Sequence, residues 1–172
     1  MTPSTDGPRW LALAGYMGAG KSRVGRGVAA RLGCEFVDAD IAIEKFAEMP
    51  IPEIFSRRGE FWFRRTETKV IRGIVMEQEP GVLALGGGAL GTEVTRKLLQ
   101  REASVVWLKV SPEVAWKRVK GSDRPLASDE GRFMRRAAAR EAVYRESADL
   151  EVDADAPADD VIDRIARWAE SR

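Results

Sequence analysis

The chain contains no histidine, which excludes mechanisms that use a histidine base and metal sites built on imidazole ligands. Its single cysteine, Cys34, excludes an internal disulfide and fits a reducing compartment. The net charge is only +1, so the chain lacks the strong positive field typical of nucleic-acid-binding proteins. We therefore expect no nucleic-acid partner.

Long apolar runs are also missing. The longest apolar stretches are far shorter than the ~20 residues that cross a bilayer. The opening stretch, MTPSTDGPRW, does not combine a basic start with an apolar run, as a secretory signal would. At 172 residues, 44% hydrophobic and 32% charged, the composition is ordinary for one globular domain. We expect a single cytoplasmic domain over residues 1–172, with no membrane partner.

Short apolar segments alternate with helical patterns along the chain. Strands are predicted at residues 10–15, 34–40, 82–85, 104–110 and 150–154. Helices are predicted at residues 21–33, 41–49, 51–59, 60–78, 92–101, 112–120, 132–147 and 158–170. This alternation is typical of a parallel sheet covered on both faces. The predicted fold class is α/β, with three layers (α/β/α) around a central five-stranded parallel sheet.

The stretch GYMGAGKS, from Gly15 to Ser22, matches the phosphate-loop pattern. It follows a predicted strand and opens a predicted helix, which is the context that the motif requires. Loop N–H groups and the helix N-terminus can surround phosphate oxygens. Lys21 would reach the β- and γ-phosphates, and the Ser22 hydroxyl would bind Mg²⁺. The alternative is an ordinary strand–turn–helix corner.

Two carboxylates, Asp38 and Asp40, end the second predicted strand. Residues two apart in a strand share a face, and the carboxyl ends of parallel strands form the ligand crevice. Together they could hold a magnesium-bound water and accept a proton from a hydroxyl. The alternative is that Asp40 caps a helix that starts at Ile41.

Three glycines, residues 86–88, follow the third predicted strand. Without side chains there, a ligand can meet bare backbone N–H groups. The alternative is a tight turn.

Several arginines could face this crevice. Arg64 and Arg65 are adjacent on a predicted helix and point about 100° apart, so only one of them can face the site. Arg124 lies in a polar loop, where an arginine commonly covers a γ-phosphate and excludes water. Arg140 and Tyr144 share a helix face. A solvated surface position is the alternative for each arginine, and simple packing is the alternative for the Arg140–Tyr144 pair.

Taken together, these residues resemble the shikimate kinase family, a small branch of the phosphate-loop kinases. The resemblance covers residues 10–168. Its markers occur in order as GYMGAGKS, FVDAD, IPEIFSRRGEFWFRRTE, LALGGGAL, DRPLA and REAVYRESADL. The phosphate loop is generic, but the whole set at these intervals is specific.

The resemblance implies an acceptor site for shikimate. Arg64 and Arg140 would hold the carboxylate with the backbone N–H of Gly87, and a carboxylate suits the planar fork of arginine. Glu67 would support an arginine, and Asp40 would bind the ring hydroxyls and act as the base. The implied acceptor-binding residues are Asp40, Phe55, Phe63, Arg64, Gly86, Gly87, Gly88 and Arg140.

The resemblance also implies ATP and Mg²⁺ as cofactors. Lys21, Asp40 and Arg124 would be catalytic, and Ser22 and Asp38 would hold the metal, Asp38 through water. The residues implied for nucleotide binding are Gly15, Met17, Gly18, Ala19, Gly20, Lys21, Ser22, Arg23, Arg118 and Arg124, with the loop Asp153–Ala158 beside the adenine. The implied substrate-binding helical segment spans about residues 41–68, and the mobile lid spans about residues 119–131.

The chain departs from the family pattern at a few positions. Arg23 replaces the usual threonine after Gly-Lys-Ser, Ala142 replaces a common proline, and the lid reads RPLAS and is one residue shorter than expected after Arg118. Two alternatives to a shikimate kinase remain open. One is a kinase-like binding or regulatory module, and the other is a related small-molecule kinase, for example one for gluconate. The family pattern implies a monomer.

Overall fold

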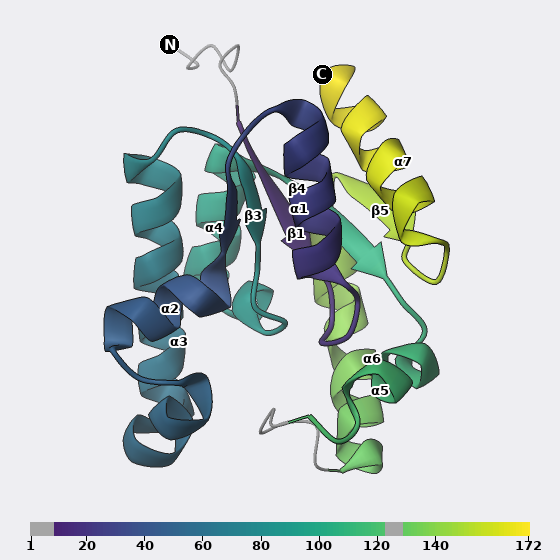
Figure 1. The fold of residues 1–172 in the computed structure, drawn as a ribbon. Coiled ribbons are helices and arrows are strands. Elements are labelled where there is room, and N and C mark those ends of the chain that lie inside the picture. Colours follow the sequence, from purple (N-terminus) through teal and green to yellow (C-terminus); the bar gives the residue numbers. More distant parts are fainter. Residues whose placement is uncertain (1–8, 123–128) are drawn as a thin grey trace.

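Five parallel strands form one sheet in the order β2-β3-β1-β4-β5 (Figure 1). The computed structural model describes residues 9–122 and 129–172. The strands are β1 (Trp10–Ala14), β2 (Phe36–Asp38), β3 (Val82–Ala84), β4 (Ala103–Lys109) and β5 (Leu150–Asp153). All four strand pairings are parallel, with β1 at the centre between β3 and β4. The predicted five-stranded parallel sheet is confirmed.

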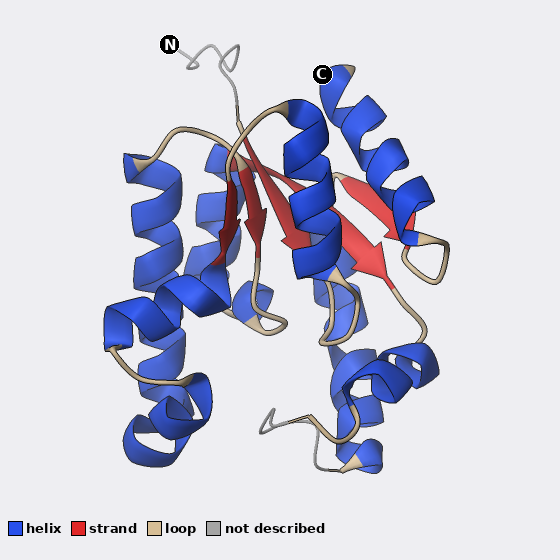
Figure 2. Cartoon of the chain, viewed as in Figure 1, coloured by secondary structure: helices blue, strands red, loops and turns tan. Residues whose placement is uncertain are grey.

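Helices cover both faces of the sheet, which gives three layers (Figure 2). One face carries α1 (Lys21–Leu32) and α7 (Ala158–Glu170), which pack against each other. The other face carries the remaining core helices α3 (Ile51–Glu77), α4 (Glu93–Glu102), α5 (Pro112–Val119) and α6 (Glu130–Ser147). Helix α2 (Ala39–Ala47) packs on α3, and a short 3₁₀ turn, η1 (Ala89–Gly91), follows β3.

The alternation of side chains along the strands produces two separate cores. On β1, Trp10 and Ala12 face the α3–α6 side, whereas Leu11 and Leu13 face α1 and α7. A strand buried on both faces must be apolar at every position, and all five residues of β1 are buried. A third small core joins α2 to α3 through Ile43, Ile54 and Phe63.

The structure corrects the prediction for residues 34–40. The second strand is shorter than predicted, and α2 begins at Ala39, so Asp40 lies in a helix rather than in a strand. Asp38 is the N-cap of α2, and its side chain accepts a hydrogen bond from the Asp40 N–H at 3.0 Å. The alternative that Asp40 caps a helix starting at Ile41 is therefore also wrong.

The predicted break at Gly59 is present inside α3. This glycine has φ 81° and ψ 169°, so the helix is interrupted there and changes direction. A side chain at this φ would be strained, which explains the glycine. The break separates a first segment, residues 51–58, from the long segment that packs against the sheet.

Candidate active site

Two adjoining cavities open where the strands end at their carboxyl edge. The first, here called the arginine cavity, has a volume of about 480 Å³ and is lined by both Arg64 and Arg140. The second, here called the phosphate-loop cavity, has a volume of about 420 Å³ and is lined by Gly18, Gly20 and Lys21. The residues that line both cavities are Ser22, Asp38, Asp40, Gly87 and Ser122.

The phosphate loop joins β1 to α1 in the predicted place. Gly20 is the N-cap of α1 in the left-handed conformation, with φ 88°. The Lys21 side chain folds back over the loop and donates to the carbonyls of Gly15 and Tyr16, at 2.7 and 3.1 Å. The loop N–H groups and the start of α1 therefore border the cavity, which suits a phosphate.

Ser22 and Asp38 form the oxygen pair at the boundary between the cavities. The Ser22 hydroxyl donates to Asp38 Oδ2 at 2.6 Å, while Asp38 Oδ1 is held by the Asp40 N–H. Hydroxyl and carboxylate oxygens are ligands that Mg²⁺ accepts, and Mg²⁺ usually completes its shell with water and substrate phosphates. Within the described residues no group of three or more His, Cys, Asp or Glu side chains is arranged to hold a metal. The hydroxyl of Ser22 and the carboxylate of Asp38 supply two oxygen ligands, and this donor set fits a divalent ion whose other ligands are water and phosphate.

Arg64 and Arg65 are separated as the helical geometry requires. Arg64 lines the arginine cavity with a side chain 19% exposed, and its Nη1 donates to Glu67 Oε2 at 2.7 Å. Its Nη2 lies 3.5 Å from Glu60 Oε1. Arg65 is exposed and lies over the ring of Phe61.

Glu67 is almost completely buried, at 1% exposure. Burial raises the pKa of its carboxyl group, and the neighbouring Arg64 opposes that rise. Its Oε1 has no hydrogen-bond partner among the described residues. The buried carboxylate of Glu67 holds Arg64 in place, as the resemblance implied. Burying the charged form of this carboxylate costs free energy.

The three glycines make room for these charged side chains. A Cβ on Gly86 would lie 2.6 Å from Glu67 Oε1 and 3.0 Å from Asp40 Oδ1. A Cβ on Gly88 would lie 2.4 Å from Arg64 Nη2. None of the three glycines has a positive φ, so turn conformation does not explain them, and close approach to the buried Glu67 accounts for Gly86.

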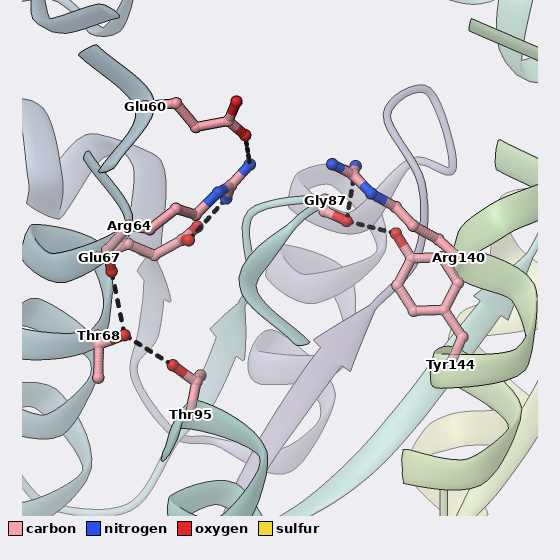
Figure 3. Close-up of polar contacts among 8 residues, drawn as sticks. All are labelled: Glu60, Arg64, Glu67, Thr68, Gly87, Thr95, Arg140 and Tyr144. Atoms are coloured by element: carbon pink, nitrogen blue, oxygen red, sulfur yellow. Dashed lines mark hydrogen bonds and ion pairs between the residues drawn. The ribbon is translucent and has the colours of Figure 1, made fainter. Parts of the chain in front are cut away.

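Arg140 and Tyr144 meet at Gly87, between the two cavities. Arg140 Nη1 donates to the Gly87 carbonyl at 3.0 Å, and the Tyr144 hydroxyl donates to the same oxygen. Figure 3 shows the guanidinium groups of Arg64 and Arg140 pointing toward each other from α3 and α6. Two cations that line one cavity favour an anionic ligand, and the planar fork of arginine suits a carboxylate.

Apolar side chains complete the arginine cavity. The rings of Phe55 and Phe63 lie 4.7 Å apart, centre to centre, and both residues line this cavity. Five further lining residues were not named individually from the sequence: Ile41, Glu44, Ile51 and Pro52, which fall in the implied substrate-binding segment, and Ser122, which falls in the implied lid. The signal that could have found Ile41 and Glu44 is their spacing on the helix that begins beside Asp38 and Asp40. Met17, predicted among the nucleotide residues, lines the arginine cavity instead of the phosphate-loop cavity.

Of the remaining predicted nucleotide residues, Arg23 and Arg118 line the phosphate-loop cavity, whereas Gly15 and Ala19 do not, and Ala19 is buried in the core beside α1. Arg118 donates to the carbonyls of Gly18 at 3.0 Å and Ala154 at 3.5 Å, so it links the phosphate loop to the predicted adenine-side loop. Arg23 lines the same cavity and is exposed. Arg124 and the central part of the predicted lid lie outside the described residues.

The fold and the two adjoining cavities define a phosphate-loop kinase, with two arginines lining the cavity beside its phosphate loop. Comparison with known proteins shows to which family of phosphate-loop kinases the chain belongs. A family model described as shikimate kinase matches residues 17–170. The chain belongs to the shikimate kinase family.

Individual relatives agree over most of their length. A shikimate kinase of Nitrobacter winogradskyi is 46% identical over 159 residues, which cover 90% of this chain and 74% of that protein. A shikimate kinase of Moorella thermoacetica is 39% identical, over 95% of this chain and 98% of that protein. The solved shikimate kinase from Acinetobacter baumannii in complex with shikimate has a TM-score of 0.91 at 34% identity, over 95% of this chain and 94% of that chain.

Proposed function

We propose that this chain transfers the γ-phosphoryl group of ATP to the 3-hydroxyl of shikimate. Membership of the shikimate kinase family carries the proposal, and the observation that supports it most is the pair of adjoining cavities. One is built from a phosphate loop and the other from two arginines and an aromatic wall. A donor and an acceptor bound in them would meet where Ser22, Asp38 and Asp40 line both.

The acceptor half of the proposal assigns the carboxylate of shikimate to Arg64 and Arg140. Bidentate pairing of arginine with a carboxylate fixes orientation as well as affinity. Asp40 lines both cavities, so a ring hydroxyl bound against it would face the donor. Phe55 and Phe63 would pack on the apolar side of the ring.

The donor half assigns the phosphates of ATP to the loop Gly15–Ser22, with Lys21 leaving its loop carbonyls for the β- and γ-phosphates. Ser22 and Asp38 would hold Mg²⁺, Asp38 through water. When bound, the ion would neutralise charge on the phosphates. Arg118 would pack on the adenine, and Arg124 would cover the γ-phosphate.

In the transfer step, the oxygen of the 3-hydroxyl forms a bond to the γ-phosphorus. The bond from that phosphorus to the β–γ bridging oxygen breaks, and ADP leaves with the electron pair. The hydroxyl proton passes to the Asp40 carboxylate. Catalysis of this kind is mostly positioning and electrostatic stabilisation, and exclusion of water prevents wasteful hydrolysis.

A coupled ADP-release assay tests the proposal with ATP and Mg²⁺. Shikimate, quinate, gluconate and no acceptor are compared at equal concentrations. Shikimate should support the fastest release, and the reaction without acceptor should be slow. ADP release that does not depend on shikimate would contradict the proposal.

We also propose that the chain acts as a cytoplasmic monomer, as the family pattern implies. Among the described residues, no helix combines the length and the apolar character needed to cross a membrane.

A further inference from the structure

The Gly87 carbonyl receives hydrogen bonds from two side chains of the same helix. Arg140 and Tyr144 are one turn apart on α6, so both reach Gly87 from one face (Figure 3). A carbonyl oxygen has two lone pairs and can accept from both donors. The Gly87–Gly88 peptide is therefore held from the α6 side.

Under the proposed function, Arg140 must bind the carboxylate of the acceptor as well as the Gly87 carbonyl. Bidentate pairing with a carboxylate in the arginine cavity needs two N–H groups of the rigid fork aligned on that ligand, and turning the guanidinium to align them would weaken its bond to Gly87. If Arg140 were the only side-chain donor to the partly buried Gly87 carbonyl, its departure would leave that oxygen without a side-chain hydrogen bond. The free-energy cost of the lost bond would oppose the movement of the guanidinium toward the carboxylate. A second donor at the same oxygen removes this opposition.

Tyr144 is fixed well enough to be that second donor. Its side chain is buried, at 4% exposure, and its ring lies 5.9 Å from the ring of Trp107, centre to centre. Burial raises the pKa of the Tyr144 hydroxyl, so the group stays protonated and remains a donor. In contrast to Arg140, Tyr144 does not line the arginine cavity.

Because Gly87 lies between the two cavities, the hydrogen bonds to its carbonyl affect the backbone that faces both of them. Gly87 lines each of them, and its Cβ position would lie 3.4 Å from the Met17 nitrogen in the phosphate loop. A peptide between two glycines rotates easily unless it is held. Losing its donors would change which backbone groups face the ligands.

We propose that Tyr144 is a positioning residue for acceptor binding. It holds the Gly87 carbonyl so that Arg140 can leave that oxygen and bind the carboxylate of the acceptor. The inference rests on the proposed function and adds a residue that does not itself touch the substrate.

The direct test is Tyr144→Phe, which keeps the ring and removes the hydroxyl. The dissociation constant for shikimate, measured by calorimetry without nucleotide, should rise about five- to tenfold, as expected for one lost hydrogen bond. The KM for ATP should change by less than about twofold. Thr95→Val is the matched control, because it removes a buried hydroxyl bonded to Thr68 at the contact between α3 and α4, and it should leave shikimate binding unchanged.

A double-mutant cycle separates positioning from general packing. In an Arg140→Ala background there is no guanidinium to release, so the loss of shikimate affinity caused by Tyr144→Phe should be smaller than in the unsubstituted protein. Replacing Tyr144 by para-aminophenylalanine restores a donor and should recover much of the affinity, and it also provides a second folded variant.

Two results would overturn the proposal. One is unchanged shikimate affinity in folded Tyr144→Phe protein, and the other is an equal loss in the Arg140→Ala background. Neither would affect the proposed function, which fails only if the unsubstituted protein does not turn over shikimate.

Discussion

Arg64 Nη1 lies 2.7 Å from Glu67 Oε2, so one of the two arginines that line the arginine cavity is held by a carboxylate that is 1% exposed. The two residues are three positions apart on α3 and share a face. Removing one partner of a buried ion pair leaves the other charge uncompensated, and that is costly. Arg64 is therefore oriented before any acceptor arrives.

We expect Arg64→Ala to reduce kcat/KM for shikimate by the equivalent of about 2–5 kcal/mol, because a desolvated charge pair with the carboxylate is lost. Arg65→Ala is the matched control. Arg65 is adjacent, exposed and outside the cavity, so its loss should leave kcat/KM nearly unchanged. Steady-state kinetics on both variants checks the prediction. Equal effects of the two substitutions would remove Arg64 from the site.

Glu67→Gln should separate stability from binding. The pKa of Glu67 is raised by burial above its ordinary value of 4.5, so the folded protein holds this proton more tightly than the unfolded chain does. Its contribution to stability is fully present below the unfolded value and is lost as pH rises through the folded pKa. The stability of the unsubstituted protein relative to Glu67→Gln should therefore fall with rising pH, in denaturant titrations from pH 4 upward.

The same variant should bind shikimate about tenfold more weakly, because an amide holds Arg64 less strongly than a carboxylate does. A stability difference that stays constant with pH would contradict the burial of an ionisable Glu67. An unchanged affinity would contradict its support of Arg64.

Gly86→Ala should lower the free energy of unfolding by about 1–3 kcal/mol, because the added Cβ would meet Glu67 Oε1 at 2.6 Å. It should also weaken shikimate binding by displacing Glu67 or Asp40. Gly73→Ala is the control, since a Cβ there meets nothing within 4 Å and the position is helical. That substitution should stabilise the protein by about 0.5–1 kcal/mol. Chemical denaturation of the two variants should give shifts of opposite sign.

Arg23→Thr, which restores the residue usual in the family, should raise the KM for ATP by about two- to fivefold, and more at low ionic strength, because exposed charges are screened by salt. Arg23 lines only the phosphate-loop cavity, so the KM for shikimate should not change. Arg26→Ala is the control, one turn along the same helix and over the Phe36 ring. A larger change in the KM for shikimate than in the KM for ATP would contradict the assignment of Arg23 to the phosphate-loop cavity.

Much of the fold could be predicted from local patterns. The strands follow from short runs of apolar residues. The end of α1 at Gly33 and the break in α3 at Gly59 follow from the backbone freedom of glycine. Each of these signals depends on nearby residues alone. The selection of Arg64 over Arg65 needed only one additional fact, namely which face of α3 is turned toward the cavity.

The parts that were not predicted depend on one local helix cap and on contacts between distant segments. Asp38 and Asp40 fit a strand by alternation, but capping by Asp38 starts the helix two residues earlier. In the sequence, Ile41, Ile51 and Pro52 look like ordinary helix residues. They are recognised as cavity residues only when α2 and the first segment of α3 are placed around the same cavity. The need for Gly86, in the loop after β3, is visible only when Glu67 of α3 is placed beside it.

The central claim is that the phosphoryl group reaches shikimate rather than water. Phosphorus NMR on a reaction with ATP, Mg²⁺ and shikimate tests it most directly, with ADP measured in parallel. The account predicts one phosphate monoester on the 3-oxygen for each ADP formed, and little inorganic phosphate. ADP accompanied by an equal amount of inorganic phosphate, with no ester, would contradict it.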